Sequence, residues 1–480
     1  MDRFLNDNIK IETASIIVGT GEHIDVRYMI SDMSIQENIY HQCMSGSVSL
    51  ADGVGLIDKL PIVGEEFFSL IFRSGESGDT FIHKVFSIYN VSNRKKMDNT
   101  LEHYTLNFSS IEGMVNIMST VNRNYIGKTY TDIAKNVFND YIINSPLKGG
   151  PEGTPYMSVG SNLIKKTTLE GGVGDGGATS GLQSLTTVGD TPFKVIQKCA
   201  NLAQSTDYPD SDFVFYEDKY QFNFCSISSL LEQEPVQFAQ YIMGDHGREE
   251  KGKNNRFRWE IVNQMEYNEG PNALRSSSTG MYGNQIHAFD PILKKRSTIT
   301  NNYLKIQNDT KIKSFSTLDK NNLMTNKSLY AEDSGTSHSQ YYINNIFDNN
   351  YEDVEYMKGR ISEKSDRNIF HHDNSYKSRG RTTMKLSLLN NYILTIAVGG
   401  NTNFVAGNVV NVEIPISSNL EEDKLKPYTH LFGNKTKNKF LITAVTHNFI
   451  GTAGRFFTHL TLAKDSYSSD INTSYDGRME

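Results

Sequence analysis

Two stretches carry residue types that chemistry often uses, but neither has the spacing that the chemistry needs. The run Gly171–Gly181, GGVGDGGATSG, suggests a phosphate-binding loop, yet it lacks the GxxxxGK[ST] spacing and no helix is expected directly after it. His371-His372-Asp373 suggests a metal site, but adjacent side chains diverge and no further ligand stands at a suitable spacing. We expect a surface loop in the first case and no metal in the second.

The remaining candidates are isolated histidines, carboxylate pairs and a basic cluster. His447 and His459 fall in predicted strands, where sheet residues are the simpler interpretation. Glu65-Glu66 point to opposite faces of a strand, and Glu421-Glu422-Asp423 falls in a loop. Lys294-Lys295-Arg296 indicates a solvated edge rather than a nucleic-acid patch. With no GxSxG or HExxH motif, we predict no enzyme, no catalytic, cofactor-binding or metal-binding residue, and no cofactor.

The overall charge and the cysteines narrow the function further. The 480 residues include 55 acidic and 48 basic ones, a net charge of −7. This balance argues against gripping nucleic acid through net charge and suits a surface past which a polyanion slides. The length predicts roughly two to four domains. Cys43, Cys199 and Cys225 are scattered, which indicates reduced thiols of a protein made in a cytosol.

We expect neither a secretory signal nor a membrane-spanning segment. The N-terminus shows no basic start followed by an apolar core. Nothing approaches the ~18 consecutive apolar residues that cross a bilayer. The sequence therefore predicts synthesis in the cytoplasm and no stable membrane insertion.

The stretch Met44–Phe72 shows the type of structure that must position these groups. Residues 46–52 alternate polar and apolar side chains and predict a strand. An apolar knot over 56–60 follows, before Pro61. A second strand over 65–72 is apolar at almost every position and is expected to be covered on both faces. The stretch therefore has the residues of a structural scaffold and contains no reactive group.

Within the first 235 residues, the sequence pattern changes at about residue 110 from short strands to a mixture of helices and strands. About six short strands indicate a small antiparallel barrel or sandwich, at 9–18, 24–30, 46–52, 65–72, 81–91 and 101–109. Residues 111–235 predict an α+β unit with a glycine-rich loop over 146–189. Its helices cover 111–119, 130–142 (capped by Thr131 or Asp132) and a stretch starting at Thr191-Pro192, and its hairpin joins 213–217 to 221–225.

The second half mixes strands with a long polar stretch. A helix is expected over Trp259–Met265 and a strand over 281–291. Residues 301–380 are rich in Asn, Asp, Ser and Tyr, which indicates an exposed insertion, partly ordered at best. Ordered structure is expected to return with a short helix or strand over 384–391, followed by strands at 392–398, 409–415, 440–447 and 456–463.

Three C-terminal strands repeat three N-terminal ones in the same order. Gly64–Phe72 and Gly407–Pro415 are each a glycine followed by a strand that is expected to be buried. Lys84–Val91 matches Lys439–Thr446, and His103–Phe108 matches Phe457–Leu462. The pattern alone leaves coincidence and duplication equally open. A duplicated chain would hold two similar barrels, and a closed trimer of such chains would present six similar walls around an axis.

Several of these motifs resemble baseplate hub proteins of contractile-tailed bacteriophages. The resemblance rests on MSGSVSLAD and LIDKLPIVGE over 44–65, on TPFKVI from Thr191, and on the 212–226 hairpin. It also includes KFLITAVTH from Lys439 and LTLAKDS from Leu460. It covers most of the chain except about 145–190 and 300–380. Type VI secretion spike proteins look similar, but normally carry a needle domain that is not seen in these residues.

The resemblance implies a mainly β fold with an inserted α+β domain and polar insertions. It assigns 1–110 to a first tube-like β-barrel, 111–235 to the α+β domain, and 236–300 with 381–466 to a second, discontinuous tube-like barrel. The insertion covers 301–380 and a tail 467–480. It also implies a homotrimeric ring that joins a sixfold tail tube to a threefold central spike and forms part of the DNA ejection channel.

The implied partners follow from that position in the virion. They are the central spike or tail lysozyme, the tail tube protein, and the tape measure and baseplate wedge proteins. DNA would pass through the channel without specific binding. The implied location is the tail baseplate, after synthesis in the host bacterial cytoplasm. Two alternatives stay open: a type VI secretion-like spike hub component, and a cell-wall-binding or hydrolysing tail enzyme.

Overall fold

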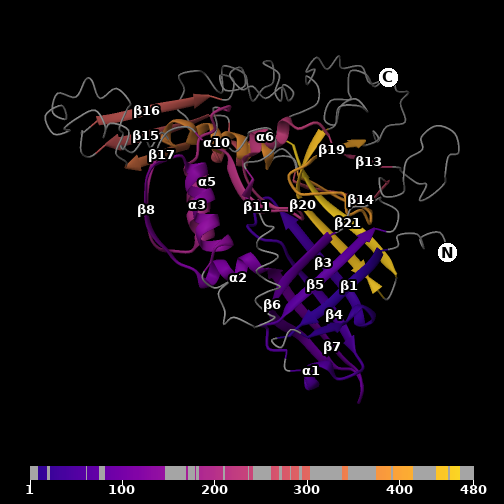
Figure 1. Cartoon of the computed structure of the whole chain (residues 1–480). Coiled ribbons are helices and arrows are strands. Elements are labelled where there is room, and N and C mark those ends of the chain that lie inside the picture. The colour runs from indigo at the N-terminus through magenta and orange to yellow at the C-terminus, as the bar shows by residue number, and fades with distance from the viewer. Residues whose placement is uncertain are drawn as a thin grey trace, which may run out of the picture.

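The main element is a sheet of thirteen strands (Figure 1). The structure is a computed structural model, and the predicted class, mainly β with an antiparallel sheet, is confirmed. It describes residues 9–18, 22–60, 62–74, 82–145, 169–170, 179, 183–208, 211–235, 237–241, 261–269, 273–281, 283–290, 295–302, 338–343, 375–390, 393–413, 439–451 and 454–464.

The first seven strands of the chain form the part of the sheet that we name the first module. Their order is β3-β4-β7-β6-β5-β1-β2. Strict alternation places Tyr104, Leu106 and Phe108 of β7 inside. The sheet curls around one core to which six of these strands contribute. The elements are β1 (Ile9–Ile17), β2 (His23–Asp25), η1 (Arg27–Met29), β3 (Ile30–Asn38), β4 (Ser45–Asp52), α1 (Leu56–Lys59), β5 (Phe67–Ser74), β6 (Ile82–Lys96) and β7 (Glu102–Ser110).

Two sequence predictions for the first module need correction. The expected strand over 24–30 is divided between β2, a 3-10 turn and the start of β3, and β3 itself was not predicted. The second strand of Met44–Phe72 begins at Phe67 and has half-buried Ser69 and Ile71 on one face, so it is not covered on both. The apolar knot is confirmed as α1, with Leu56 buried.

The α+β unit follows, with α2 (Ile111–Met118), β8 (Val121–Lys128), α3 (Tyr130–Phe138), η2 (Asn139–Ile143), β9 (Leu169–Glu170), β10 (Gln183–Asp190), α5 (Pro192–Leu202), β11 (Phe213–Glu217), β12 (Phe222–Ser226) and α6 (Ile227–Glu232). Phe138, Phe193, Phe215 and Phe222 pack ring against ring in its core. The predicted hairpin is confirmed as β11 and β12.

The predicted start of α5 is confirmed, with Thr191 at the N-cap and Pro192 as the first helical residue, although the Thr191 side chain makes no cap bond. Two other predictions for this unit are revised. The cap of α3 is Thr129, whose hydroxyl accepts from the Asp132 amide at 3.1 Å, and not Thr131 or Asp132. The region expected as a loop contains β10, which pairs with the unpredicted β8.

Six later strands close into a ring, which we name the second module. They are β13 (Gln237–Tyr241), β14 (Ile261–Glu269), β18 (Ile393–Gly399), β19 (Val409–Glu413), β20 (Lys439–Ile450) and β21 (Arg455–Ala463). Each pairs with the next in the order β13, β14, β18, β21, β20, β19, and β19 returns to β13. The helix expected over Trp259–Met265 is wrong, because Ile261 begins β14.

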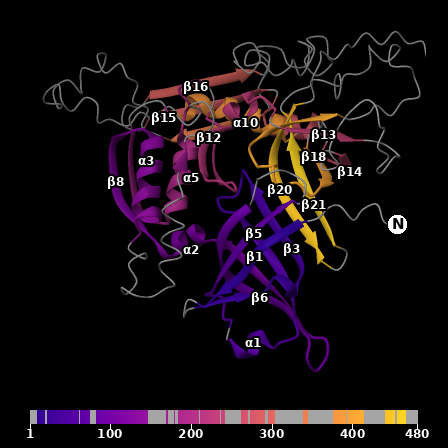
Figure 2. The same cartoon turned by 45° about the vertical axis from the view of Figure 1, so that its right-hand side comes forward.

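A separate sheet lies next to α10, above α3 and α5 of the α+β unit at the upper left (Figures 1 and 2). It contains β15 (Gly283–Asp290), β16 (Lys295–Asn302) and β17 (His338–Ile343), and it follows α7 (Ala273–Ser278). Asn284 of β15 donates to the Gly380 carbonyl of α10 (Ser375–Leu389) at 2.8 Å. Helix α10 starts inside the range expected as an insertion; most of that range and the tail lie outside the described residues.

The two modules repeat each other in strand order and in two of their β-bulges. The bulge between Ile88 and Asn90 in the β6–β7 pair recurs between Ile442 and Ala444 in the β20–β21 pair. A second bulge, where β3 meets β4, recurs where β14 meets β18. The repeat therefore matches β3, β4, β5, β6 and β7 with β14, β18, β19, β20 and β21. In the structure Ile88 corresponds to Ile442, so the sequence match of Lys84–Val91 with Lys439–Thr446 is displaced by one residue. The match of Gly64–Phe72 with Gly407–Pro415 is displaced by the same amount.

Candidate functional site at the joint between the modules

The first and second modules are joined through one strand pair. Seven residues of β3 pair antiparallel with β20, from Asn38 opposite Ala444 to Asp32 opposite Ile450. The Ile39 amide extends the ladder by donating to the Thr443 carbonyl at 2.9 Å. Figure 2 shows the two strands side by side. Thirteen strands thus form one sheet, and we name the β3–β20 pair the joint.

One face of the sheet across the joint carries mainly hydroxyl and amide side chains, with the His459 imidazole and the Phe457 ring among them. Register places these half-buried residues in rows across six adjacent strands, from β18 to β7. The charged residues on this face of the six strands stand near strand ends, Asp32 in β3 opposite Ser49 and Arg455 in β21. We name this set the polar face: Ser34, Gln36, Asn38, Ser45, Ser47, Ser49, Thr105, Asn107, Ser109, Thr395, Thr446, Asn448, His459 and Thr461.

The opposite face of the joint is buried and includes one acid. Glu37 of β3 is 0% exposed and lies opposite Val445. Its Oε2 accepts from the Ala406 amide at 3.2 Å, and its Oε1 has no partner among the described residues. Burial, with a smaller effect from the charge of Asp218, raises the pKa of Glu37 to about 8.

His447 lies under the joint as a packed neutral ring. It is 1% exposed, and its Nδ1 is 3.1 Å from the Thr458 hydroxyl. Its ring packs against those of Phe72 and Phe456, with centroids 6.3 and 6.0 Å away. Burial lowers its pKa to about 3, so the imidazole stays uncharged. His447 is therefore a sheet residue, as the sequence suggested, and His459 belongs to the polar face.

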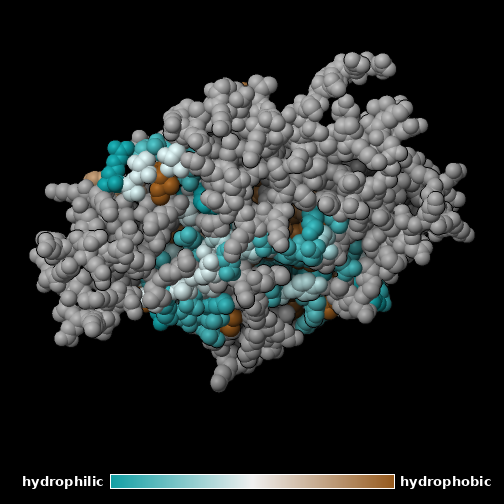
Figure 3. Space-filling view, turned by 90° about the horizontal axis from the view of Figure 1, so that it is seen from above, coloured by the Kyte–Doolittle hydropathy of each residue, from teal (hydrophilic) through white to brown (hydrophobic). Residues whose placement is uncertain are grey.

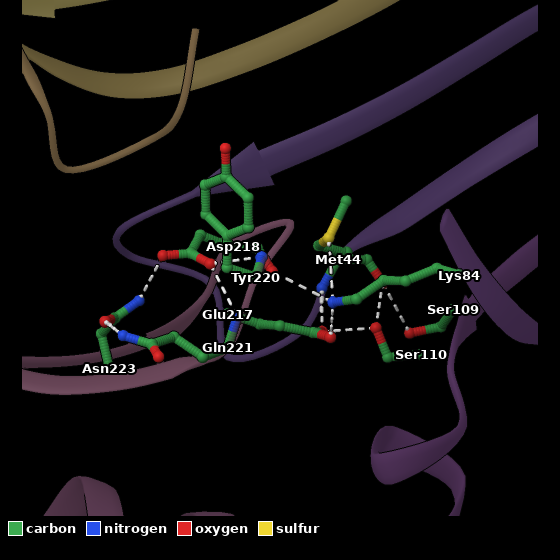
Figure 4. Close-up of polar contacts among 9 residues, drawn as sticks. All are labelled: Met44, Lys84, Ser109, Ser110, Glu217, Asp218, Tyr220, Gln221 and Asn223. Carbon is green, nitrogen blue, oxygen red and sulfur yellow. Dashed lines mark hydrogen bonds and ion pairs between the residues drawn. The ribbon is translucent and has the colours of Figure 1, made fainter. Parts of the chain in front are cut away.

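The tip of the β11–β12 hairpin docks against the first module. The Glu217 carboxylate is 1% exposed and accepts from three groups of that module: the Lys84 ammonium, the Ser110 hydroxyl and, at 2.8 Å, the Met44 amide. Lys84 also donates to the Asp218 carbonyl at 3.0 Å. Figure 4 shows these groups converging from Met44 just before β4, Lys84 of β6, Ser110 at the end of β7, and the hairpin.

The same tip also contacts the second module. The buried Lys219 ammonium donates to the Thr402 carbonyl in the loop before β19. The Asp218 side chain closes the hairpin turn by accepting from the Tyr220 and Gln221 amides at 2.6 and 2.8 Å. Gly407 leaves room for Tyr216, because a Cβ there would lie 2.1 Å from the Tyr216 hydroxyl. The hairpin therefore ties both modules together.

The buried charges at the hairpin are structural. Burial alone would lower the pKa of Lys84, but the carboxylates of Glu217 and Glu112 raise it above its ordinary value. Lys84 therefore stays charged, and an intact pair satisfies its buried partner. No acid–base or nucleophilic pair with an open approach emerges from these contacts. These contacts fix the position of the hairpin against the first module.

The other sequence candidates are dispersed. Glu66 stabilises its own turn by accepting from the Val63 and Gly64 amides at 2.9 Å each. Lys295 and Arg296 begin β16, an edge strand of its sheet, which agrees with the predicted strand edge. Of Gly171–Gly181, only Thr179 is described. The His371–Asp373 and Glu421–Asp423 clusters and Lys294 lie outside the described residues.

Two features are absent from the described residues. No three His, Cys, Asp or Glu side chains are grouped closely enough to hold a metal ion. No described helix is both long and apolar enough to span a bilayer. Seen from above, the described surface is mainly hydrophilic, with hydrophobic residues in small separate spots (Figure 3).

The structural neighbours are phage tail proteins and type VI secretion spike proteins, the classes that the sequence resembles. No protein-family model matches the sequence, and no curated protein matches it. A tail protein from Neisseria meningitidis MC58 is similar with 11% identity over 94% of this chain and 96% of that one, at a TM-score of 0.49.

Two further structures give the range of these similarities. The 43 kDa tail protein of prophage MuSo2 from Shewanella oneidensis has 8% identity, coverage of 94% and 98%, and a TM-score of 0.49. The E. coli c3393 protein is described as a type VI secretion component with structural similarity to the T4 tail proteins gp27 and gp5. It has 9% identity, coverage of 95% and 76%, and a TM-score of 0.39.

Proposed function

We propose that this chain is the structural hub of a contractile phage tail baseplate. The observation that carries the proposal is the repeat of one strand arrangement in two modules joined edge to edge. Three such chains supply six similar walls, which suits an adapter between a sixfold tail tube and a threefold central spike. Each module acts as a tube-like barrel in this ring.

The polar face suits the wall of the DNA ejection channel. Hydroxyl and amide groups offer no cationic row to the phosphate backbone, and cationic contacts supply most non-specific affinity for DNA. The net charge of −7 acts in the same direction. DNA then passes along the face without specific binding.

The proposed partners are those of a hub at the tail tip. The chain holds the central spike or tail lysozyme and contacts the tail tube, the tape measure and the baseplate wedge proteins. It is located in the virion baseplate after synthesis in the host cytoplasm. Its contribution is mechanical, and any cell-wall hydrolysis comes from the spike.

Co-expression with the spike and tail tube proteins of the same phage tests the proposal. We expect a complex of the chain with the spike, three copies to three, that caps tube oligomers, and no peptidoglycan hydrolysis by the chain alone. Hydrolysis by the purified chain, abolished by a single substitution, would contradict the proposal. Failure to retain the spike at micromolar concentration would also contradict it.

A further inference from the structure

The first module leaves one strand edge without a neighbour among the described residues. On one side, β6 pairs with β7 along its length. On the other, β5 accompanies it only to Ser87, and the last hydrogen bond joins the Ile88 amide to Glu66. The edge from Asn90 to Lys96 is left open, and its side chains are mostly exposed. An open edge of this length needs a partner or protection.

The second module leaves a matching edge. β14 pairs with β18 along its length, whereas β13 covers only Ile261 and Val262 on the other side. In the described part of the chain, no strand lies beside that edge from Gln264 to Glu269. The exposed Gln264 and Glu266 stand on this stretch.

The internal repeat relates these two open edges to the two edges that pair in the joint. Strand β6 corresponds to β20, and β14 corresponds to β3. The portions that β20 and β3 use in the joint, Ala444–Ile450 and Asp32–Asn38, correspond to the two open edges. The chain therefore holds both halves of a second joint, at positions that do not face each other within one copy.

The repeat also sets the register of this second joint. Asn448 faces Phe457 as Lys95 faces His103, and each pair lies on the polar-face side of its module. Glu266 faces Thr395 as Ser34 faces Ser47. In the existing joint Ser34 lies opposite Asn448. Transferred to the second joint, Glu266 lies opposite Lys95, and Met265 lies opposite Lys96.

We infer that β14 of one copy pairs antiparallel with β6 of a second copy of this chain, in the register Glu266–Lys95. The exposed acid and base then form a complementary cross-strand pair. Asn93, at a φ of 54°, lies where β6 has an extra residue before Lys95. Repeating the contact head to tail closes a ring and continues the sheet with its polar face. The inference rests on the proposed function for the number of copies.

Disulfide trapping in the full-length chain tests the register. Two double variants, Lys95→Cys with Glu266→Cys and Lys96→Cys with Met265→Cys, sample neighbouring positions of the ladder. Adjacent cross-strand pairs alternate between wide and close spacing, so one of them suits a disulfide. We expect a ladder of covalent dimer and trimer on non-reducing gels, with an unchanged native mass. The single-cysteine variants, which keep the native Cys43, Cys199 and Cys225, are the controls.

Charge reversal gives an independent readout. Lys95→Glu or Glu266→Lys alone places like charges opposite each other, and each is expected to weaken association by about fivefold per interface. The double reversal restores it. Lys59→Glu, an exposed reversal on α1, leaves association unchanged.

The outcomes separate this inference from the proposed function. A stable trimer that yields no disulfide with either double variant, and is unaffected by charge reversal, overturns the β6–β14 joint and leaves the hub intact. Covalent rings of another copy number support the joint and contradict the trimer. A chain that stays monomeric at micromolar concentration, without cross-links, overturns both.

Discussion

The two modules share a strand plan but differ in how the plan is completed. In the second module β13 lies between β14 and β19 and closes the ring. In the first module β1 pairs with β5 but not with β3, and the edge of β3 is filled by β20. The difference is one of closure: β13 completes a ring in the second module, whereas no strand completes one in the described part of the first module, where β20 lies beside β3 instead.

The hairpin compensates for the open first module. Its Glu217 contacts the first module, and Lys219 reaches the second. The core of the first module also borrows Phe456 from β21. The first module is therefore expected to depend on these contacts more than the second does, and substitutions can test that asymmetry.

Removal of the Glu217 carboxylate is expected to have the largest effect. Glu217→Ala leaves the Lys84 ammonium and the Met44 amide without their buried acceptor. We expect the free energy of unfolding to fall by about 3–5 kcal/mol, measured by denaturant titration, with β6 amides losing exchange protection before those of β20. Asp140→Ala breaks the exposed Arg123–Asp140 pair and is the control, with a loss below about 1 kcal/mol. Equal small losses would refute the asymmetry.

The pH dependence of Glu37 tests the joint itself. Its pKa in the folded chain, about 8, is raised above the ordinary 4.5. Because this pKa is raised on folding, the contribution of Glu37 to the free energy of unfolding is fully present below pH 4.5 and is lost as the pH rises through 8. Relative to Glu37→Gln, wild-type unfolding free energy should therefore fall by about 1.4 kcal/mol per pH unit between roughly pH 5 and 8.

Unfolding titrations at several pH values measure this difference. The exposed Glu65→Gln, which removes a carboxylate outside the joint, is the matched control. A pH-independent difference for Glu37→Gln would show that the carboxylate is not buried at the joint.

Gly407→Ala is expected to have a smaller effect. Gly407 has a φ of +90° and faces the Tyr216 hydroxyl, whereas Gly454 has a φ of +58° and an open surrounding. Both substitutions cost about 1 kcal/mol of backbone strain, and Gly407→Ala about 1–2 kcal/mol more through overlap. Tyr216→Phe should recover part of that excess in thermal unfolding. Equal losses at both glycines would place the hairpin away from the second module.

Much of the strand content could be predicted because alternation survives wherever one face is buried. β7 and β21 show this, with buried residues at every second position. β3 was missed because the buried Glu37 interrupts its apolar face. The Trp259–Met265 prediction failed because short apolar spacings fit a helix and a strand equally well.

The buried contacts at the hairpin tip could not be predicted from local patterns. Lys84 and Glu217 are 133 residues apart in the chain, and neither has a neighbour that identifies its partner. Their signal was a charged residue at the end of an apolar strand. The repeat was visible in three strands, but its register needed the bulges, which depend on pairing between strands.

Native mass combined with two-dimensional class averages of the purified full-length chain tests the central claim most directly. The account predicts a trimer with a central hole and six similar lobes, because each copy contributes two modules in one continuous sheet. A monomer at micromolar concentration, or a closed assembly without a hole, would contradict it.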